Sequence, residues 1–350
     1  MRVAALTQGY FTPATRFRVR QHIPKLQNFG IDVVEYCPEI NAYAGVPFNL
    51  DRWPRLARLP MVAAWQGLKI GLRIPHVYQT RRYDVTWLQR ELLPGYLTLE
   101  RILKLPLVFD VDDAIWLSRT YVAERVAKIA ARATTIFAGN ICIAEWFSPF
   151  NNNIVVIPTA VDINRFYPLE CVHRESFTVG WIGVSANLRY IEEIAPALIA
   201  FLKQHDDVVL FVVADQAPKL PIALGRQFRY LAWSEFVEAE AIQNMDVGIM
   251  PLSDNEWTRG KCSFKMLQYM ACGIPVVVSP VGMNATVLGL GNIGFGASTI
   301  DEWVDALNYL YQNRTAGRQM GNKGREIVET GFSTDVVSQM IAEAFKSIGS

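Results

Sequence analysis

Two lysines near the start of an amphipathic run could bind a diphosphate. Lys261 and Lys265 are four residues apart, so on a helix they would share one face. Gly273 and Pro275 would stop that helix, and residues 276–278, all valine, are strand-like. A helix N-terminus with two lysines suits a diphosphate through its dipole and its charge. An ordinary αβ unit with surface lysines would show the same spacing.

Three carboxylates follow another apolar stretch and could serve several kinds of chemistry. Asp110, Asp112 and Asp113 come at the end of the strand-like run 107–110. A D-x-D pair at a strand end can bind a divalent metal, or act as the nucleophile and acid of a phosphatase. Such aspartates can also cap the loop that follows the strand.

The elements that must position these residues alternate between strand and helix patterns, which predicts an α/β protein with parallel sheets. The first half contains strand-like runs at residues 3–6, 30–36, 84–88, 107–110, 134–138 and 154–157. The second half contains them at residues 177–183, 208–213, 228–231, 247–250 and 274–278. A polar, turn-rich segment, 162–176, lies between the halves. We therefore expect two Rossmann-like domains that face a central cleft, with ligands at the strand carboxyl ends.

Composition narrows the function classes. The net charge of +1 does not suggest a general nucleic-acid binder. The 5 cysteines form no C-x-x-C pair and the 4 histidines are scattered, so we expect isolated thiols in a reducing compartment and no metal site. No apolar run approaches the roughly 20 residues needed to span a bilayer. We expect a cytoplasmic protein that could sit on the inner membrane face.

The stretch 52–82 is basic and apolar together. It contains seven Lys and Arg residues and no Asp or Glu, with tryptophans and leucines between them. A membrane-surface helix facing anionic lipid has this composition, and so does a packed helix pair with a basic outer face. We favour the packed helix pair, because helices of this length and hydrophobicity mostly fill cores.

The run from Met270 to Val277, Met-Ala-Cys-Gly-Ile-Pro-Val-Val, resembles the nucleotide-sugar motif of GT-B glycosyltransferases of retaining family 4. Residues 157–166, 83–91, 109–116 and 16–20 are also similar to that family. The resemblance implies the GT-B fold, with an acceptor-side domain at 1–165 and a nucleotide-sugar domain at 166–332. It also implies a last helix, 333–350, that crosses back to the first domain.

The resemblance implies a set of donor-binding positions. They are Gly9, Tyr10, Gly183, Ser185, Trp233, Lys261, Ser263, Lys265, Gln268, Gly282, Met283 and Asn284. Two family glutamates are replaced, because Gln268 occupies the ribose-binding position and Gly260 the earlier one. Asp254 or Glu256 could contact the sugar hydroxyls instead. Several of these positions have plain structural alternatives: Gly9 and Gly282 could serve tight turns, and Trp233 could be a core or rim residue.

The resemblance also implies a reaction. Lys261 and Lys265 would stabilise a leaving nucleoside diphosphate without a metal or other cofactor, and Asp112 and Asp113 would act on the acceptor side with Arg16 and Arg18. The donor would be UDP-glucose or a related UDP-hexose, and the acceptor a polysaccharide or lipid-linked glycan. One alternative is a nucleotide-sugar-binding protein without catalysis. The other is a metal-dependent phosphatase that uses Asp110 and Asp112.

Overall fold

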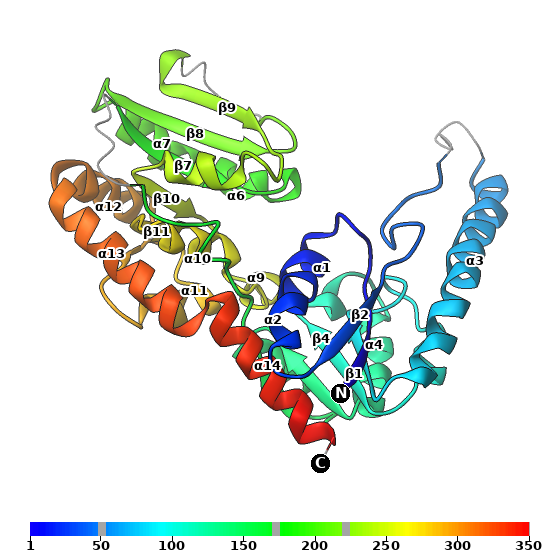
Figure 1. Ribbon diagram of the computed structural model, residues 1–350. Coiled ribbons are helices and arrows are strands. Elements are labelled where there is room, and N and C mark those ends of the chain that lie inside the picture. Colours follow the sequence, from blue (N-terminus) through cyan, green and yellow to red (C-terminus); the bar gives the residue numbers. More distant parts are fainter. Residues whose placement is uncertain (48–53, 170–175, 219–224, 350) are drawn as a thin grey trace. The chain divides into compact units, whose positions relative to one another are not determined.

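The protein divides into two compact units in a computed structural model that describes residues 1–47, 54–169, 176–218 and 225–349. The first unit combines Met1–Thr159 with Val337–Ser350, and the second is Ala160–Val336 (Figure 1). The boundary thus falls shortly before the position expected from the sequence. Each unit contains one parallel sheet, which confirms the predicted α/β class with two Rossmann-like sheets.

The first unit is built on a six-stranded sheet of order β2-β1-β3-β4-β5-β6. Its strands are β1 (Arg2–Leu6), β2 (Asp32–Tyr36), β3 (Val85–Gln89), β4 (Leu107–Val111), β5 (Thr135–Ala138) and β6 (Ile154–Val156). Every residue of β3 and β4 is buried, as expected for central parallel strands that helices cover on both faces. Because all six strands are parallel, the loops that follow β1, β3 and β4 emerge at the same edge of the sheet.

The helices of this unit connect the strands. They are α1 (Pro13–Arg18), α2 (Ile23–Gln27), α3 (Arg55–Gln79), α4 (Val122–Arg132) and α5 (Ile141–Phe147). The chain returns to the unit in α14 (Thr334–Gly349), whose Phe345 is fully buried. The Phe345 ring packs 5.3 Å from Trp87 and 5.6 Å from Phe137, centroid to centroid. The last helix therefore completes the aromatic core of the first unit.

The second unit repeats the architecture with a parallel sheet of order β12-β11-β10-β7-β8-β9. Its strands are β7 (Phe177–Ile182), β8 (Val208–Ala214), β9 (Phe228–Ala232), β10 (Val247–Met250), β11 (Val276–Val278) and β12 (Gly294–Gly296). Its helices are α6 (Leu188–Glu193), α7 (Ala195–Leu202), α8 (Glu238–Gln243), α9 (Glu256–Arg259), α10 (Phe264–Ala271), α11 (Met283–Leu288), α12 (Ile300–Gln312) and α13 (Arg314–Gly331).

Small residues let α10 approach the sheet closely. An added Cβ on Gly248 in β10 would lie 2.3 Å from the Tyr269 ring of α10. The Tyr269 hydroxyl accepts a hydrogen bond from the Ile182 backbone N–H at 3.0 Å and donates to the Ile249 carbonyl. The helix that carries Lys265 is thereby fixed against the strands that end beside it.

The stretch 52–82 is one helix and not the favoured helix pair. Arg52 lies outside the described residues, and α3 covers most of the remainder. Lys69 and Arg73 are only 5% and 4% exposed, so they face inward and the expected basic outer face is wrong over this part of the helix. In the parts of the chain that the structure describes, no helix is long and apolar enough to cross a bilayer.

Candidate functional site

The two lysines of the basic motif do not share a helix face. The α10 helix starts at Phe264, because Ser263 has a left-handed backbone with φ of 51° that separates the helix from the preceding loop. Lys261 therefore lies on the loop after α9, with its Nζ 5.6 Å from the centroid of the Trp257 ring. Lys265 lies in the first turn of α10, at the positive end of the helix dipole.

Lys265 is held next to the glycine loop that follows β7. An added Cβ on Gly183 would lie 2.6 Å from Lys265 Cε and 2.6 Å from Trp181 Cη2. The Lys265 Nζ lies 5.8 Å from the centroid of the Trp181 ring, and the lysine is half-buried. The structure thus brings together two predicted donor residues, Gly183 and Lys265, from segments far apart in the sequence. The Trp181 ring packs against both Gly183 and Lys265.

A second pair of predicted donor residues joins the start of α10 to the loop after β11. The Ser263 hydroxyl donates to Asn284 Oδ1 at 2.6 Å, and Asn284 Nδ2 donates to the Ser279 carbonyl at 3.0 Å. Ser263 and Asn284 are buried, and Met283 is 8% exposed. Gly282 has a φ of 54°, and an added Cβ there would lie 2.6 Å from the Arg259 carbonyl oxygen. Glycine is needed at 282 for this close backbone approach.

The loop after β7 ends beside a carboxylate that sequence reasoning missed. Asp215, just after β8, accepts from the Ser185 backbone N–H at 2.5 Å and from its hydroxyl at 2.7 Å. Partial burial opposes ionisation, but these hydrogen bonds hold the pKa of Asp215 below its ordinary value. An anionic ligand would therefore be repelled near Ser185 and favoured nearer Lys265. Trp233 follows β9 and is 38% exposed, which leaves part of its ring accessible.

Gln268, on the same helix as Lys265, is part of a buried polar network. Its Nε2 donates to Glu238 Oε1 at 3.1 Å, and the other oxygen of Glu238 pairs with Arg165 Nη2 at 3.1 Å. Gln268 is 2% exposed and Glu238 is 5% exposed. A carboxylate is therefore present beside position 268, but it comes from α8. Glu238 could not be identified from the sequence, because it lies thirty residues from Gln268 and matches no motif.

A cavity of about 280 Å³ opens at the carboxyl ends of β10, β11 and β12. Residues 251–254, Ser279 and residues 298–300 line it, with Trp303 and parts of α6 and α7 behind them. Asp254, an expected substitute for the missing glutamate, is among the lining residues and pairs with Arg259 Nε at 2.7 Å. Carboxyl ends of parallel strands are the usual ligand-binding edge of such sheets.

In the first unit, the predicted donor loop after β1 is tightly braced. An added Cβ on Gly9 would lie 2.4 Å from Asn41 Nδ2 and 2.8 Å from Thr12 Oγ1, so a larger residue would require those side chains to move. Tyr10 is 63% exposed, and the Arg20 guanidinium lies 4.2 Å from its ring centroid and donates to its carbonyl at 2.6 Å. Glu35 holds Arg20 through two hydrogen bonds of 2.7 and 2.8 Å. The loop therefore exposes the Tyr10 ring, which Arg20 and Glu35 hold in position.

Arg90 organises the carboxylates after β4 and was missed by sequence reasoning. Its Nε donates to Asp112 Oδ1 at 2.7 Å, and its Nη2 lies 3.6 Å from Asp113 Oδ2. Arg90 has a left-handed backbone with φ of 54°, which is unusual outside glycine and frequent at functional sites. Its Nη1 donates to the Tyr43 hydroxyl at 3.2 Å, and that hydroxyl donates to Gln8 at 3.0 Å. Burial would raise the pKa of Asp112, but the Arg90 charge lowers it below the ordinary value, so Asp112 is ionised.

Asp110 has a structural environment. It is 1% exposed, and Arg18 Nη2 pairs with its Oδ1 at 2.8 Å while Trp87 Nε1 donates to its Oδ2 at 3.1 Å. Burial raises the pKa of Asp110 to about 6, although Arg18 opposes the rise. A carboxylate enclosed in this way cannot act as an exposed nucleophile, so the phosphatase alternative is wrong on this point. Among the described residues, no group of three His, Cys, Asp or Glu side chains could hold a metal ion.

The two predicted acceptor-side arginines lie in different environments. Arg18 is 2% exposed, and its Nη1 also donates to the Ile157 carbonyl at 2.6 Å, which indicates a structural role. Arg16 is half-buried, with its guanidinium 4.1 Å from the centroid of the Phe17 ring. Its acceptor-side role stays a prediction.

Comparison with known proteins gives a family match over part of the second unit. Residues 176–313 match the family model described as Glycosyl transferases group 1. No curated protein sequence matches the chain. The structure is similar to sucrose-phosphate synthase from Thermosynechococcus elongatus, with a TM-score of 0.70 and 13% identity over 99% of this chain and 98% of that one.

Two further solved structures have the same fold. The Anabaena protein HepE, in complex with UDP and glucose, gives a TM-score of 0.68 and 16% identity over 99% of this chain and all (100%) of HepE. WaaG, a glycosyltransferase involved in lipopolysaccharide biosynthesis, gives a TM-score of 0.65 and 13% identity over 97% of this chain and 98% of WaaG.

Proposed function

We infer that this chain, a glycosyltransferase with the GT-B fold and a match to glycosyl transferases group 1, moves a hexose from a UDP-sugar to a glycan acceptor. The observation that carries this proposal is the contact of Lys265 with the Gly183 loop, inside the segment that matches the family. HepE is recorded with UDP and glucose, which supports UDP-glucose as the first donor to test. WaaG is involved in lipopolysaccharide biosynthesis, which supports a polysaccharide or lipid-linked acceptor. The resemblance of the run 270–277 to the motif of retaining family 4 supports a retaining enzyme of that family.

The second unit would bind the donor. The Lys265 ammonium and the N-terminus of α10 would stabilise the negative charge that develops on the leaving diphosphate. Lys261 would add charge from its loop, and Gly183 would let the backbone approach the phosphates. This chain supplies cations for that role, so the proposed reaction needs no divalent metal.

The first unit would act on the acceptor. Asp112 is ionised and oriented by Arg90, so it would accept a hydrogen bond from the attacking hydroxyl or stabilise the oxocarbenium-like transition state. The hydroxyl would attack from the face that the diphosphate leaves, which retains the configuration of the anomeric carbon. Asp113, whose Oδ2 lies 3.6 Å from Arg90 Nη2, would assist Asp112 in this role. We propose that these steps take place in the cytoplasm, with peripheral contact to a membrane.

Donor binding can be tested by thermal shift with UDP, GDP, ADP and their sugar conjugates, each with and without EDTA. Binding to the native state raises Tm by mass action. We expect a shift with UDP and UDP-glucose that EDTA does not change. A shift that requires metal, or none with any nucleotide, would overturn the proposed chemistry.

The residue that carries the proposal has its own test. Lys265→Ala should weaken UDP binding, measured by calorimetry, by roughly 10- to 150-fold, since a charge-assisted contact contributes about 1.5–3 kcal/mol. Arg318→Ala removes an exposed cation from α13 and should leave UDP binding unchanged. Unchanged affinity in Lys265→Ala would remove the lysine from the donor site.

A further inference from the structure

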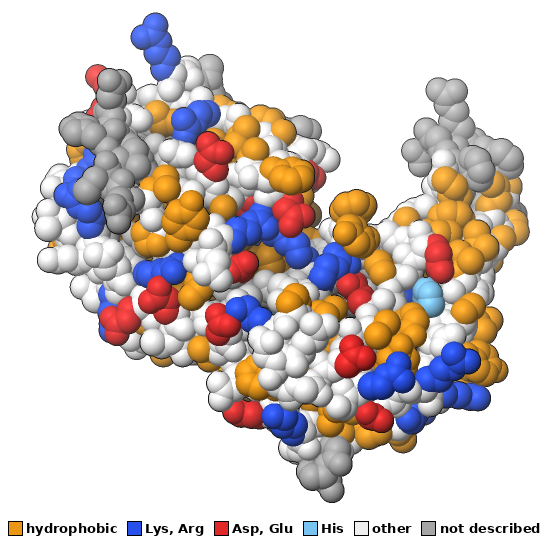
Figure 2. All heavy atoms as spheres, in the orientation of Figure 1, with side chains coloured by type: hydrophobic (Ala, Val, Ile, Leu, Met, Phe, Trp, Pro, Cys, Tyr) orange, Lys and Arg blue, Asp and Glu red, His pale blue; other side chains and the backbone are white. Residues whose placement is uncertain are grey.

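The α3 helix has the reverse of the usual polarity of a surface helix. From Leu59 to Tyr78, every exposed position holds a hydrophobic residue, a proline or a glycine. Leu59 is 58% exposed, Leu68 is 49% exposed and Ile74 is 42% exposed. Figure 2 shows hydrophobic side chains gathered along this helix. Surface helices of soluble proteins normally turn such residues inward.

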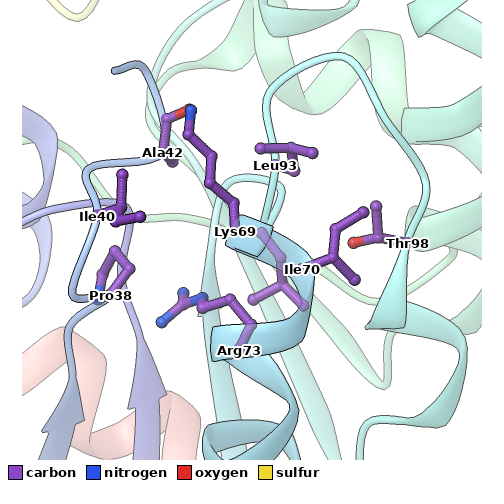
Figure 3. Close-up of a pocket in the computed structure, with 9 residues that line it drawn as sticks. Pro38, Ile40, Ala42, Lys69, Ile70, Arg73, Leu93 and Thr98 are labelled. Atoms are coloured by element: carbon purple, nitrogen blue, oxygen red, sulfur yellow. The ribbon is translucent and has the colours of Figure 1, made fainter. Parts of the chain in front are cut away.

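The polar residues of α3 are on its inner side. Lys69 Nζ donates to the carbonyls of Ala42 and Ala44 at 3.0 and 2.6 Å, and Arg73 donates to the Thr7 carbonyl at 2.6 Å. Figure 3 shows both side chains reaching from the helix into the pocket beside Pro38, Ile40 and Ala42. Buried cations are costly unless they are hydrogen-bonded, so these contacts fix the rotation of α3. The apolar face is therefore held outward by specific contacts.

Charge indicates what covers this face. Arg81 and Arg82 are exposed directly after the helix, and residues 52–83 contain no Asp or Glu. The Arg81 guanidinium lies 4.7 Å from the centroid of the Tyr78 ring, which is 53% exposed. An apolar helix face with an aromatic ring and arginines at its end matches the boundary between acyl chains and anionic headgroups. The same stretch of a second copy of the chain would offer these arginines no carboxylate.

We propose that the outward face of α3, Leu59 to Tyr78, docks on an anionic lipid bilayer with the helix in the plane of the interface. The proposal deepens the proposed function by naming the surface at which a lipid-linked acceptor would be met. The inner side of α3 links this surface to the predicted acceptor residues. Lys69 holds the loop of Ala42 and Ala44, and Tyr43 on that loop contacts Arg90.

The test is sedimentation of the full chain with phosphatidylcholine vesicles, with and without about one quarter phosphatidylglycerol. We expect binding to the anionic vesicles and a loss of about tenfold or more in Leu59→Ser/Leu68→Ser/Ile74→Ser. Ile141→Ser, at a 54% exposed position of α5, is the matched control and should bind like wild type. Arg81→Gln/Arg82→Gln should lose roughly 25-fold on anionic vesicles only, about fivefold for each arginine.

Three results would overturn the proposal: no binding by wild type, full binding by the triple variant, or a wild-type dimer in solution that the triple variant abolishes. The last result would assign the face to a second copy of the chain. UDP affinity is measured on the same variants. Because UDP would bind the second unit, intact vesicle binding with no UDP binding would refute the proposed donor chemistry alone, and the reverse result would refute the docking surface alone.

Discussion

A single methyl group at position 183 should disturb donor binding through Lys265. In Gly183→Ala the new Cβ would lie 2.6 Å from Lys265 Cε, whereas carbon atoms in contact are normally about 3.5–4.0 Å apart. The Lys265 side chain is the flexible partner, so its end must move by about 1 Å. That displacement removes part or all of a charge-assisted contact worth about 1.5–3 kcal/mol, which predicts roughly a 10- to 150-fold rise in the Kd for UDP.

The same methyl group also meets Trp181, 2.6 Å from Cη2, so some stability will be lost as well. Overpacking of this kind costs about 1–3 kcal/mol in unfolding free energy. Gly331→Ala is the matched control, because an added Cβ there has no heavy atom within 4 Å. Calorimetry at a temperature well below the Tm of each variant separates the loss of UDP affinity from the loss of stability.

A double-mutant cycle tests whether the effect passes through the lysine. We expect Gly183→Ala to change the Kd for UDP little in a Lys265→Ala background, because the displaced group is already gone. If the two substitutions weaken binding by independent factors, Gly183 acts through its own backbone and the argument from the Lys265 contact is wrong. If neither changes the Kd, the donor does not bind at this loop.

The remaining predictions concern buried charges. Burial lowers the pKa of His22 to about 3, below the ordinary 6.5, so stability is lost as pH falls from 6.5 towards 3. Between pH 7 and pH 5 the unfolding free energy from urea titration should fall by about 2 kcal/mol more in wild type than in His22→Asn. An equal fall in the two proteins would contradict this. Arg90→Gln should raise the pKa of Asp112, because the neighbouring positive charge is removed. The acid limb of the pH–rate profile should then move to higher pH while UDP affinity stays the same. An unmoved acid limb would refute a catalytic role for the Arg90–Asp112 pair. Gln268→Glu should lower the unfolding free energy by about 3–5 kcal/mol, because it places a second buried carboxylate against Glu238. The double variant Glu238→Gln/Gln268→Glu should recover part of that loss. A double variant as unstable as Gln268→Glu alone would argue against charge repulsion.

Most of the fold was predictable because the central strands are buried on both faces. The run 208–213 is a continuous apolar segment and 107–110 is apolar up to Asp110, and each became a strand of nearly the expected length. The strand β12, Gly294–Gly296, was not predicted, because a Gly-Phe-Gly segment has neither length nor β-branched residues. Its partner strand β11 holds it in place, which is tertiary information.

The candidate site was less predictable, because the residues that position its side chains are far from them in the sequence. Motif spacing pointed to Lys265 and the family resemblance pointed to Gly183, and the structure brings the two residues into contact. Nothing local marks Arg90 or Glu238, whose roles depend on partners more than twenty residues away. The polarity of α3 was predicted wrongly because backbone carbonyls, which carry no sequence signal, are what attract Lys69 inward.

The aromatic core of the first unit has a consequence for synthesis of the chain. Phe345 fills the space between Trp87 and Phe137, and it is translated after the whole of the second unit. Domains generally fold as they leave the ribosome, N-terminal first, but here the first-made unit has an unfilled core until residue 345 has been made. The second unit can therefore fold first despite its later position. A premature stop near residue 336 would release a well-formed second unit attached to a first unit with an exposed aromatic gap, a product that quality-control proteases should recognise.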